Sequence, residues 1–129
     1  MANESVLDAS VLLAVFKEER FGQDVLNVLE GAVMSATNFA EVLTRLIDLD
    51  MPLTNPKVAS VFSLLDRIEP FTEAHARVAA DLRRETRHAG LSLADRACLA
   101  LALEIGADVY TADQPWSRVD VGCKIHLIR

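Results

Sequence analysis

The sequence of 129 residues has few aromatic side chains, at 5%, so its core has to be built from aliphatic residues. Cysteine is also scarce. Cys98 and Cys123 form no Cys-x-x-Cys pair and have no histidine at zinc-binding spacing, which excludes a disulfide framework and a zinc-finger site. Cys98 lies in an apolar run and is expected to be a small buried side chain in a protein of a reducing compartment.

Long apolar runs are absent as well. No segment reaches the ~18 uncharged apolar residues that a membrane span requires. The N-terminus has no basic region followed by an apolar run, so the sequence predicts no secretory signal. These absences favour a cytoplasmic protein without a membrane partner.

The sequence also lacks an excess of positive charge. It has 13 Lys and Arg residues and 19 Asp and Glu residues, so its net charge is −6. Taken alone, this balance argues against nucleic-acid binding, because phosphate contacts require a basic surface. The objection weakens where carboxylates gather around a divalent cation that reverses the local field. A local arginine cluster, or a basic partner surface, would also weaken it.

What remains is the composition of an ordinary globular protein, 51% hydrophobic and 25% charged. The length predicts a single domain over residues 1–129. Short apolar runs alternate with helical patterns, which favours an α/β fold with a parallel sheet.

The pattern predicts strands at 6–7, 32–35, 68–71 and 109–111, and an edge strand at 124–128. Predicted helices begin at Ser10 and at Asn38 (ending before Met51-Pro52), and others cover 22–30, 56–66, 72–87 and 92–105. The helix that begins at Ser92 is apolar almost all round, so we expect it to be central and buried.

Four acidic residues fall at matching places in this pattern. Asp8 and Asp113 each follow a strand, whereas Glu41 and Asp95 each lie in the first turn of a helix. In an open parallel sheet, the carboxyl ends of the strands and the amino ends of the following helices share one edge, where ligands bind. We therefore expect these acids to meet in space.

Carboxylates that are brought close repel one another, and at least one would need a raised pKa. A hard divalent cation removes the conflict, and Mg²⁺ or Mn²⁺ prefers oxygen ligands. Such an ion yields a nucleophilic water near neutral pH and stabilises negative charge on a phosphate. A metal-bound water and a cation next to a phosphate together indicate phosphodiester hydrolysis.

Each acid also has an ordinary structural interpretation. The Asn38-x-x-Glu41 and Ser92-x-x-Asp95 spacings fit a helix capping box, or nearly so. Glu41 could pair with Arg45 one helical turn on. The two acids that follow strands could be simple turn residues. From the pattern alone, a metal site and this structural alternative both stay open.

Three segments, VLDASVLLAVF (6–16), SATNFAEVLTRL (35–46) and GLSLADRACLALALEIGADVYTAD (90–113), together resemble the PIN domain, and most closely its VapC toxins. The resemblance extends over nearly the whole chain. It implies a three-layer α/β fold in which helices flank a short central parallel sheet. It also implies a Mg²⁺- or Mn²⁺-dependent endoribonuclease.

The four acids match the acidic positions of the family one by one. By this resemblance, Asp8 and Asp95 are the chief metal ligands, Glu41 holds or orients the attacking water, and Asp113 completes the site directly or through water. Thr111 matches a position where the family often has a small hydroxyl residue. After Asp113 the family often has a basic and an aromatic residue, but this chain reads Gln-Pro-Trp.

The resemblance further implies partners. VapC toxins typically form homodimers. They are typically inhibited by a small VapB-like antitoxin, which often presents an arginine to the acidic site. The antitoxin's other half typically binds promoter DNA in a larger toxin–antitoxin assembly. The expected substrate is RNA.

A few further residues are candidates for substrate contacts. Arg96 could touch a phosphate or brace a carboxylate, and Ser10 could cap a helix or turn its hydroxyl toward the site. Trp116 could stack on a base, although packing within the domain is the commoner role. The basic residues near the end of the 72–87 helix could contact RNA, but they also complement the helix dipole, which we favour: Arg83, Arg84 and Arg87.

Two other classes of protein compete with the nuclease. A phosphatase of the two-aspartate type needs a second aspartate two residues after Asp8, where this chain has Ser10. A PIN-like binding module without activity is the other alternative. The complete set of four acids argues against it, because an idle site has no reason to gather repelling charges.

Overall fold

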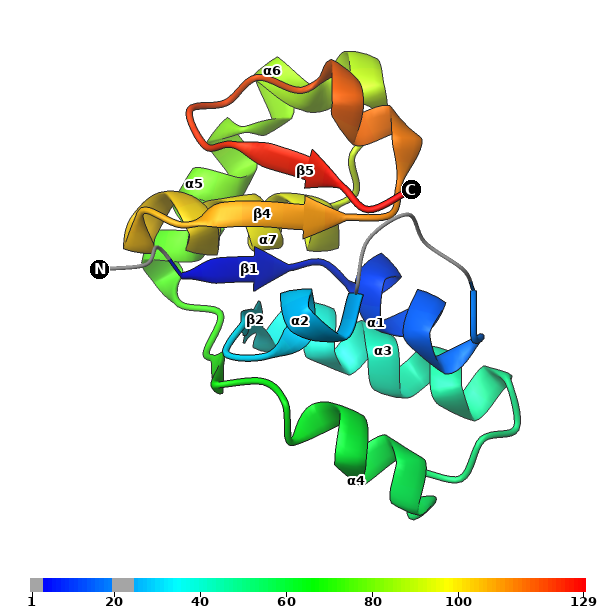
Figure 1. Ribbon diagram of the computed structural model, residues 1–129. Helices are drawn as coiled ribbons and strands as arrows, with labels where there is room; N and C mark the ends of the chain where they lie inside the picture. Colours follow the sequence, from blue (N-terminus) through cyan, green and yellow to red (C-terminus); the bar gives the residue numbers. More distant parts are fainter. Residues whose placement is uncertain (1–3, 20–24) are drawn as a thin grey trace.

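A parallel sheet of five short strands forms the centre of the computed structural model, which describes residues 4–19 and 25–129 (Figure 1). The strands stand in the order β3-β2-β1-β4-β5, and every neighbouring pair is parallel. Their bounds are Ser5–Leu7 (β1), Val33–Ser35 (β2), Arg67–Glu69 (β3), Asp108–Thr111 (β4) and Ile125–Leu127 (β5). The predicted parallel sheet, with its last strand at an edge, is confirmed.

Helices cover both faces of this sheet. They are α1 (Ala9–Phe16), α2 (Val25–Leu29), α3 (Ala36–Asp48), α4 (Pro56–Phe62), α5 (Glu73–Asp81), α6 (Arg83–Thr86) and α7 (Leu93–Ile105), with short 3₁₀ turns at Arg87–Ala89 (η1) and Gln114–Arg118 (η2). No helix within the described ranges is long and apolar enough to cross a membrane.

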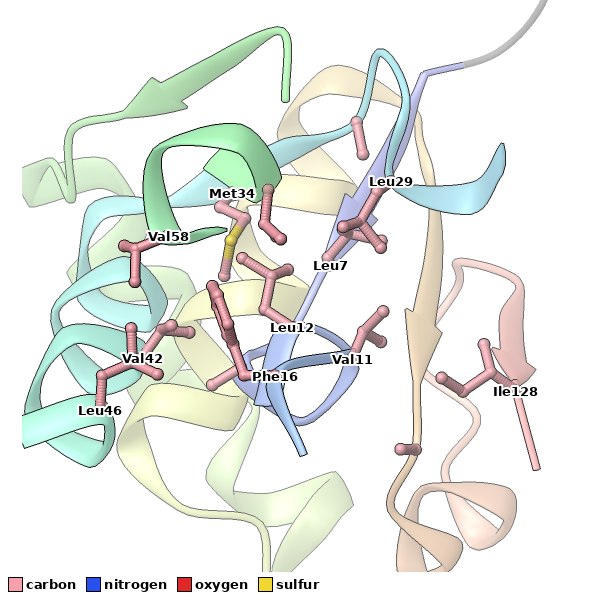
Figure 2. Packing of buried hydrophobic residues seen from close by; sticks show 14 residues of the cluster. Leu7, Val11, Leu12, Phe16, Leu29, Met34, Val42, Leu46, Val58 and Ile128 are labelled. Carbon is pink, nitrogen blue, oxygen red and sulfur yellow. The ribbon is translucent and has the colours of Figure 1, made fainter. Parts of the chain in front are cut away.

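Alternate residues of the strands feed two separate hydrophobic cores. Leu7 and Met34 pack with residues of α1, α3 and α4, such as Leu12, on one face (Figure 2). Val6 packs with residues of α7, such as Leu99, on the other face. The period-2 alternation of a strand produces this division, and the result is the three-layer α/β fold expected from the sequence.

The two helices that follow β1 and β2 begin earlier than predicted. Asp8 is the N-cap of α1, and Ser35 is the N-cap of α3. Both residues keep extended backbones, with ψ of 173° and 141°, so each strand passes directly into its helix. The predicted starts at Ser10 and Asn38 are therefore wrong, because these residues already lie within the first turn.

Other boundaries differ in smaller ways. The predicted 72–87 helix is α5, α6 and η1 in succession, joined at Leu82, whose dihedral angles (φ −62°, ψ −15°) tighten the helix. The helix predicted at 56–66 ends at Phe62, and η2 was not predicted. Of the helix predicted at 22–30, the part before Val25 lies outside the described residues.

The prediction of a buried α7 is confirmed. Its residues 97–102 are all buried, although Leu93 is 56% exposed. Ser92 and Asp95 form a capping box, in which Ser92 Oγ accepts from the Asp95 N–H at 3.1 Å and Asp95 Oδ2 accepts from the Ser92 N–H at 2.9 Å. The helix ends at Gly106, whose φ of +68° is left-handed. Cys98 is buried within α7, and both cysteines are free, as expected.

Candidate metal centre

Three aspartates from distant parts of the chain meet at the carboxyl edge of the sheet. Asp8 begins α1, Asp95 lies in the first turn of α7, and Asp113 follows β4. One carboxylate oxygen from each lies within 4.8 Å of the other two. These aspartates line a pocket of about 230 Å³ that Glu41 of α3 also lines. The fold thus brings the four predicted acids to one pocket, with Glu41 outside the close group of three.

Strand pairing and one buried amide place these acids together. β1 and β4 are neighbours, and the Asp8 N–H donates to the Tyr110 carbonyl at 3.3 Å, so Asp8 emerges beside the end of β4. Asn38, which is fully buried, donates from Nδ2 to the Ala94 carbonyl at 3.0 Å. This bond ties the first turns of α3 and α7. Asp95 lies in the first turn of α7 as predicted, whereas Glu41 lies in the second turn of α3, because α3 begins earlier than predicted.

Two hydroxyl groups hold the carboxylate of Asp8. Ser10 donates to Oδ1 at 2.6 Å, and Thr111 donates to Oδ2 at 2.9 Å. Each hydroxyl oxygen in turn accepts a backbone N–H, that of Ala112 at 2.8 Å and that of Asp113 at 3.1 Å. The donated backbone protons fix the direction of each hydroxyl, so the orientation of Asp8 is set from both sides.

This network shows where the structure places two predicted substrate contacts. The hydroxyls of Ser10 and Thr111 point at Asp8, so their described contacts are to the acid itself. The alternative in which Ser10 turns toward the site is the one observed, and its role as a helix cap is wrong. Substrate binding by either residue stays a prediction.

The electrostatics of Asp8 favour its protonated form. Burial raises the pKa of this carboxyl to about 7, although the hydrogen bonds from Ser10 and Thr111 oppose the change. The negative charges of Asp113 and Asp95 raise it further. Without a cation, the centre therefore holds a proton more tightly than an ordinary aspartate does.

Two more acids share this behaviour. Burial is the largest cause of the raised pKa of Asp95, and its hydrogen bonds with Ser92 oppose the change. Burial and the charge of Asp95 raise the pKa of Glu41, which the Asn38 amide opposes. Three acids of one pocket thus have raised pKa values, which is the conflict that a divalent cation relieves.

The pairing of Glu41 with Arg45 that the sequence allowed does not form in the structure. Among the ion pairs of the described residues, none joins these two side chains, although the charge of Arg45 lowers the pKa of Glu41 slightly. The capping-box interpretation of Glu41 is also wrong, because Ser35 caps α3. For Asp95 the capping box is real, yet its carboxylate still belongs to the group of three.

Arg96 lies away from the pocket lining. Its guanidinium donates to the Ala79 carbonyl of α5 at 2.7 Å and so holds α7 against α5. This contact supports neither a phosphate contact nor a brace for a carboxylate, and substrate binding by Arg96 stays a prediction.

The remaining candidates pack elsewhere. Trp116 is 1% exposed, which confirms that it packs within its own domain. Arg84 pairs with Asp81 at 2.9 Å on the surface, and none of the three arginines predicted near this helix end lines the pocket. The three histidines contact Glu104, Arg118 and Asp108, so none was missed as a ligand.

The sequence interpretation missed four residues of the site. Asn38 was taken for a helix cap, although an amide inside the apolar stripe of a helix is itself a signal of a buried contact. The pocket is also lined by three cations that were not predicted: Lys17, Arg45 and Arg129. Arg45 had a signal, one turn after Glu41, whereas Lys17 and Arg129 had none.

The sequence profile of the PIN domain matches residues 5–122, which is nearly the whole chain. This chain belongs to the PIN domain family. No curated protein matches it in sequence. The matched range includes both strand-to-helix junctions and the four predicted acids.

Solved structures share this PIN fold at low sequence identity. A chain of the DNA-bound VapBC from Salmonella typhimurium is 17% identical, with a TM-score of 0.74 over 99% of this chain and 100% of that chain. A chain of VapBC2 from Rickettsia felis, bound to a DNA fragment from its promoter, is 17% identical, with a TM-score of 0.69 over 97% of this chain and 98% of that chain. A chain of VapBC-5 from Mycobacterium tuberculosis is 20% identical, with a TM-score of 0.62 over 99% of each chain.

Proposed function

We propose that this PIN domain is a Mg²⁺- or Mn²⁺-dependent endoribonuclease. One observation carries the proposal: the carboxylate oxygens of Asp8, Asp95 and Asp113 lie within 4.8 Å of one another at the carboxyl edge of a parallel sheet. Carboxylates at this spacing repel one another and match the ligands of a hard cation.

The residues present fit such a cation. All three offer oxygen, the ligand that Mg²⁺ and Mn²⁺ prefer over Zn²⁺-type nitrogen and sulfur sites. Asp8 is 2% exposed, and no basic side chain of the described residues pairs with it, so its ionised form lacks a counter-charge there. When bound, the metal ion supplies a water of lowered pKa and stabilises the charge that develops on a phosphate.

The side chains then have distinct tasks. Asp8, held by Ser10 and Thr111, would give the cation a fixed ligand, and Asp95 and Asp113 would complete the ligand set. We assign to Glu41, in the same pocket but outside the close group, the task of orienting the attacking water and accepting its proton. The raised pKa of Glu41 makes it a stronger base than an ordinary glutamate, which supports this task.

The biological setting follows from the resemblance to VapC toxins and from the VapBC complexes that share the fold. We propose that the chain is a cytoplasmic toxin inhibited by a VapB-like antitoxin. We further propose that it forms a homodimer within a larger toxin–antitoxin assembly. The acidic pocket supports this partner, because an arginine presented by an antitoxin would pair with its carboxylates.

The test is cleavage of total RNA by protein purified free of any antitoxin, with Mg²⁺ or Mn²⁺. The Asp95→Asn variant is prepared identically and run beside it. We expect discrete fragments with the wild type and none with the variant or after addition of a chelator. Mapping the fragment ends would then identify the cut RNA.

Three outcomes contradict the proposal. Equal cleavage by both proteins would indicate a contaminating nuclease. Binding of metal without cleavage of any RNA pool would favour the inactive binding module. Cleavage of a DNA strand of matched sequence at the same rate would show that the enzyme is not specific for RNA.

A further inference from the structure

The pocket has an acidic floor and a cationic rim, which we define as Lys17 and Arg45. Lys17 is the C-cap of α1, and Arg45 lies in the last turn of α3. Both side chains line the same pocket as Asp8 and Glu41, and both residues are exposed. α1 and α3 pack against each other and continue beyond the carboxyl ends of β1 and β2 (Figure 1).

The two cations of the rim have no anionic partner among the described residues. Arg129, the third cation of the pocket, differs, because it pairs with Glu19 and donates to the Ala112 carbonyl at 3.1 Å. Four other lysine and arginine side chains of the surface form ion pairs with carboxylates, with N–O distances of 2.5–3.1 Å: Lys57, Arg67, Arg77 and Arg84. The charges of Lys17 and Arg45 are therefore available to a ligand.

The two rim residues lie at different distances along their helices from the acids. Arg45 lies one turn beyond Glu41, a rise of about 6 Å, and Lys17 lies nine residues beyond Asp8, a rise of about 13 Å. One positive charge of the rim therefore lies nearer to the acids along its helix than the other does.

We propose that Arg45 and Lys17 bind two backbone phosphates that lie to one side of the cut phosphate, on the α1–α3 side of the pocket. The inference rests on the proposed function and adds a direction for the strand. A chain of net charge −6 with an acidic pocket repels a polyanion, and a cation held by the acids neutralises only the phosphate next to it. The flanking phosphates need positive charges of their own, which the rim supplies.

Binding of a fluorescein-labelled single-stranded RNA oligonucleotide tests this assignment, with Ca²⁺ in place of Mg²⁺ so that the strand stays uncut. The double variant Lys17→Gln/Arg45→Gln is compared with Arg77→Gln/Arg84→Gln. The second variant loses the same charge from exposed ion pairs on α5 and α6, away from the pocket. Equal thermal stability and equal metal affinity of all three proteins serve as the folding control.

We expect the rim variant to bind the RNA at least about tenfold more weakly at low salt than the charge-matched control. The slope of log Kd against log salt concentration should fall by about 1.4, since each phosphate contact to a single strand contributes about 0.7. In cleavage assays, KM for RNA should rise more in the rim variant than in the charge-matched control.

A substrate with a single phosphate separates the rim from the metal centre. Bis(p-nitrophenyl) phosphate has no flanking phosphates, so we expect the rim variant to lose much less activity on this diester than on RNA, each measured against the wild type. Equal losses on this diester and on RNA would overturn the inference, because the rim would then act on the centre itself.

Two further results would also overturn it. The rim variant could bind RNA as tightly as the control does, which would leave Lys17 and Arg45 to an acidic segment of a protein partner or to the dipole of a helix C-terminus. Both variants could lose affinity equally, which would show a nonspecific charge effect. A wild type that cuts no RNA would overturn the proposed function, whereas the binding comparison would still decide the rim.

Discussion

The carboxyl group of Asp8 is 2% exposed and surrounded by hydroxyls and other acids, and this setting links protonation to stability. Its pKa is about 7 in the folded protein, against 3.8 for an ordinary aspartate. Between these values the folded protein keeps the proton that the unfolded chain releases. The free energy of unfolding therefore falls as pH rises through this window.

We expect the melting temperature of the metal-free protein, relative to that of Asp8→Asn, to fall as pH rises from about 4 to about 7. The difference should be constant above that range, where both states are ionised. Thermal melts of the wild type and of Asp8→Asn, both in the presence of a chelator, measure this difference in melting temperature. A difference that increases with pH would show that Asp8 is already ionised in the folded, metal-free protein.

The hydroxyl of Thr111 is the second residue-scale feature with a testable consequence. Thr111→Val removes the donor to Asp8 Oδ2 and the acceptor of the Asp113 N–H, and leaves both groups unpaired. We expect a loss of about 1–3 kcal/mol in stability. Affinity for Mn²⁺ should fall about 10- to 100-fold, as for other groups that orient metal ligands.

Calorimetric titration with Mn²⁺ and denaturant unfolding measure these two effects. Thr111→Ser keeps the hydroxyl and should restore most of the metal affinity. A loss of metal affinity in Thr111→Ser together with unchanged affinity in Thr111→Val would show that the methyl group, and not the hydroxyl, is responsible.

At the scale of elements, the capping box of α7 joins the helix start to the metal centre. Ser92→Ala should cost about 1 kcal/mol of stability, because the Asp95 N–H loses its acceptor. It should also weaken Mn²⁺ binding, because the capping box fixes the position of Asp95.

Thr72→Ala is the matched control for this variant. Thr72 also accepts an N–H at the N3 position of its helix, from His75 at 3.1 Å, but α5 begins away from the pocket. We expect a similar loss of stability and unchanged metal affinity. Equal effects of the two variants on metal binding would contradict the role given to the α7 cap.

Elements that are defined by a local pattern were predictable from the sequence. The buried apolar runs of β1, β2 and β4 and the apolar surface of α7 follow directly from the periodicity of the sequence. The starts of α1 and α3 were misplaced because each start was assigned to a polar residue three positions after the predicted strand, at Ser10 and at Asn38. In the folded chain, the last strand residue or the residue directly after it is the cap, and a local rule cannot show this.

The same division applies to the site. The four acids could be placed at one edge, because the topology of a parallel sheet brings strand ends together. The contacts that orient these acids could not be predicted from the sequence. Thr111 and Asp8 are 103 residues apart, and Asn38 and Ala94 are 56 residues apart. Side-chain hydrogen bonds over such separations depend on the finished packing.

At the scale of the whole molecule, the group of three aspartates joins segments from both ends of the chain. α1, α7 and the turn after β4 each contribute one aspartate, so a cation held by all three binds only the folded state. We expect Mn²⁺ at 100 times its Kd to stabilise the protein by about 2.7 kcal/mol.

Thermal melts with and without Mn²⁺ check this expectation, and Asp95→Asn should show a much smaller increase in melting temperature. Ca²⁺ and Mg²⁺ provide a comparison of hard cations. An equal increase for the variant and the wild type would place the bound ion outside the three-aspartate centre.

The position of Trp116 has a practical consequence. It is the single tryptophan of the chain, is 1% exposed, and lies in η2, where its backbone N–H donates to the Asp113 carbonyl at 3.2 Å. Its fluorescence therefore comes from one place in the molecule, three residues after Asp113. A shift of this turn on loading with a cation, or on docking of a partner, changes the emission of an indole that needs no label.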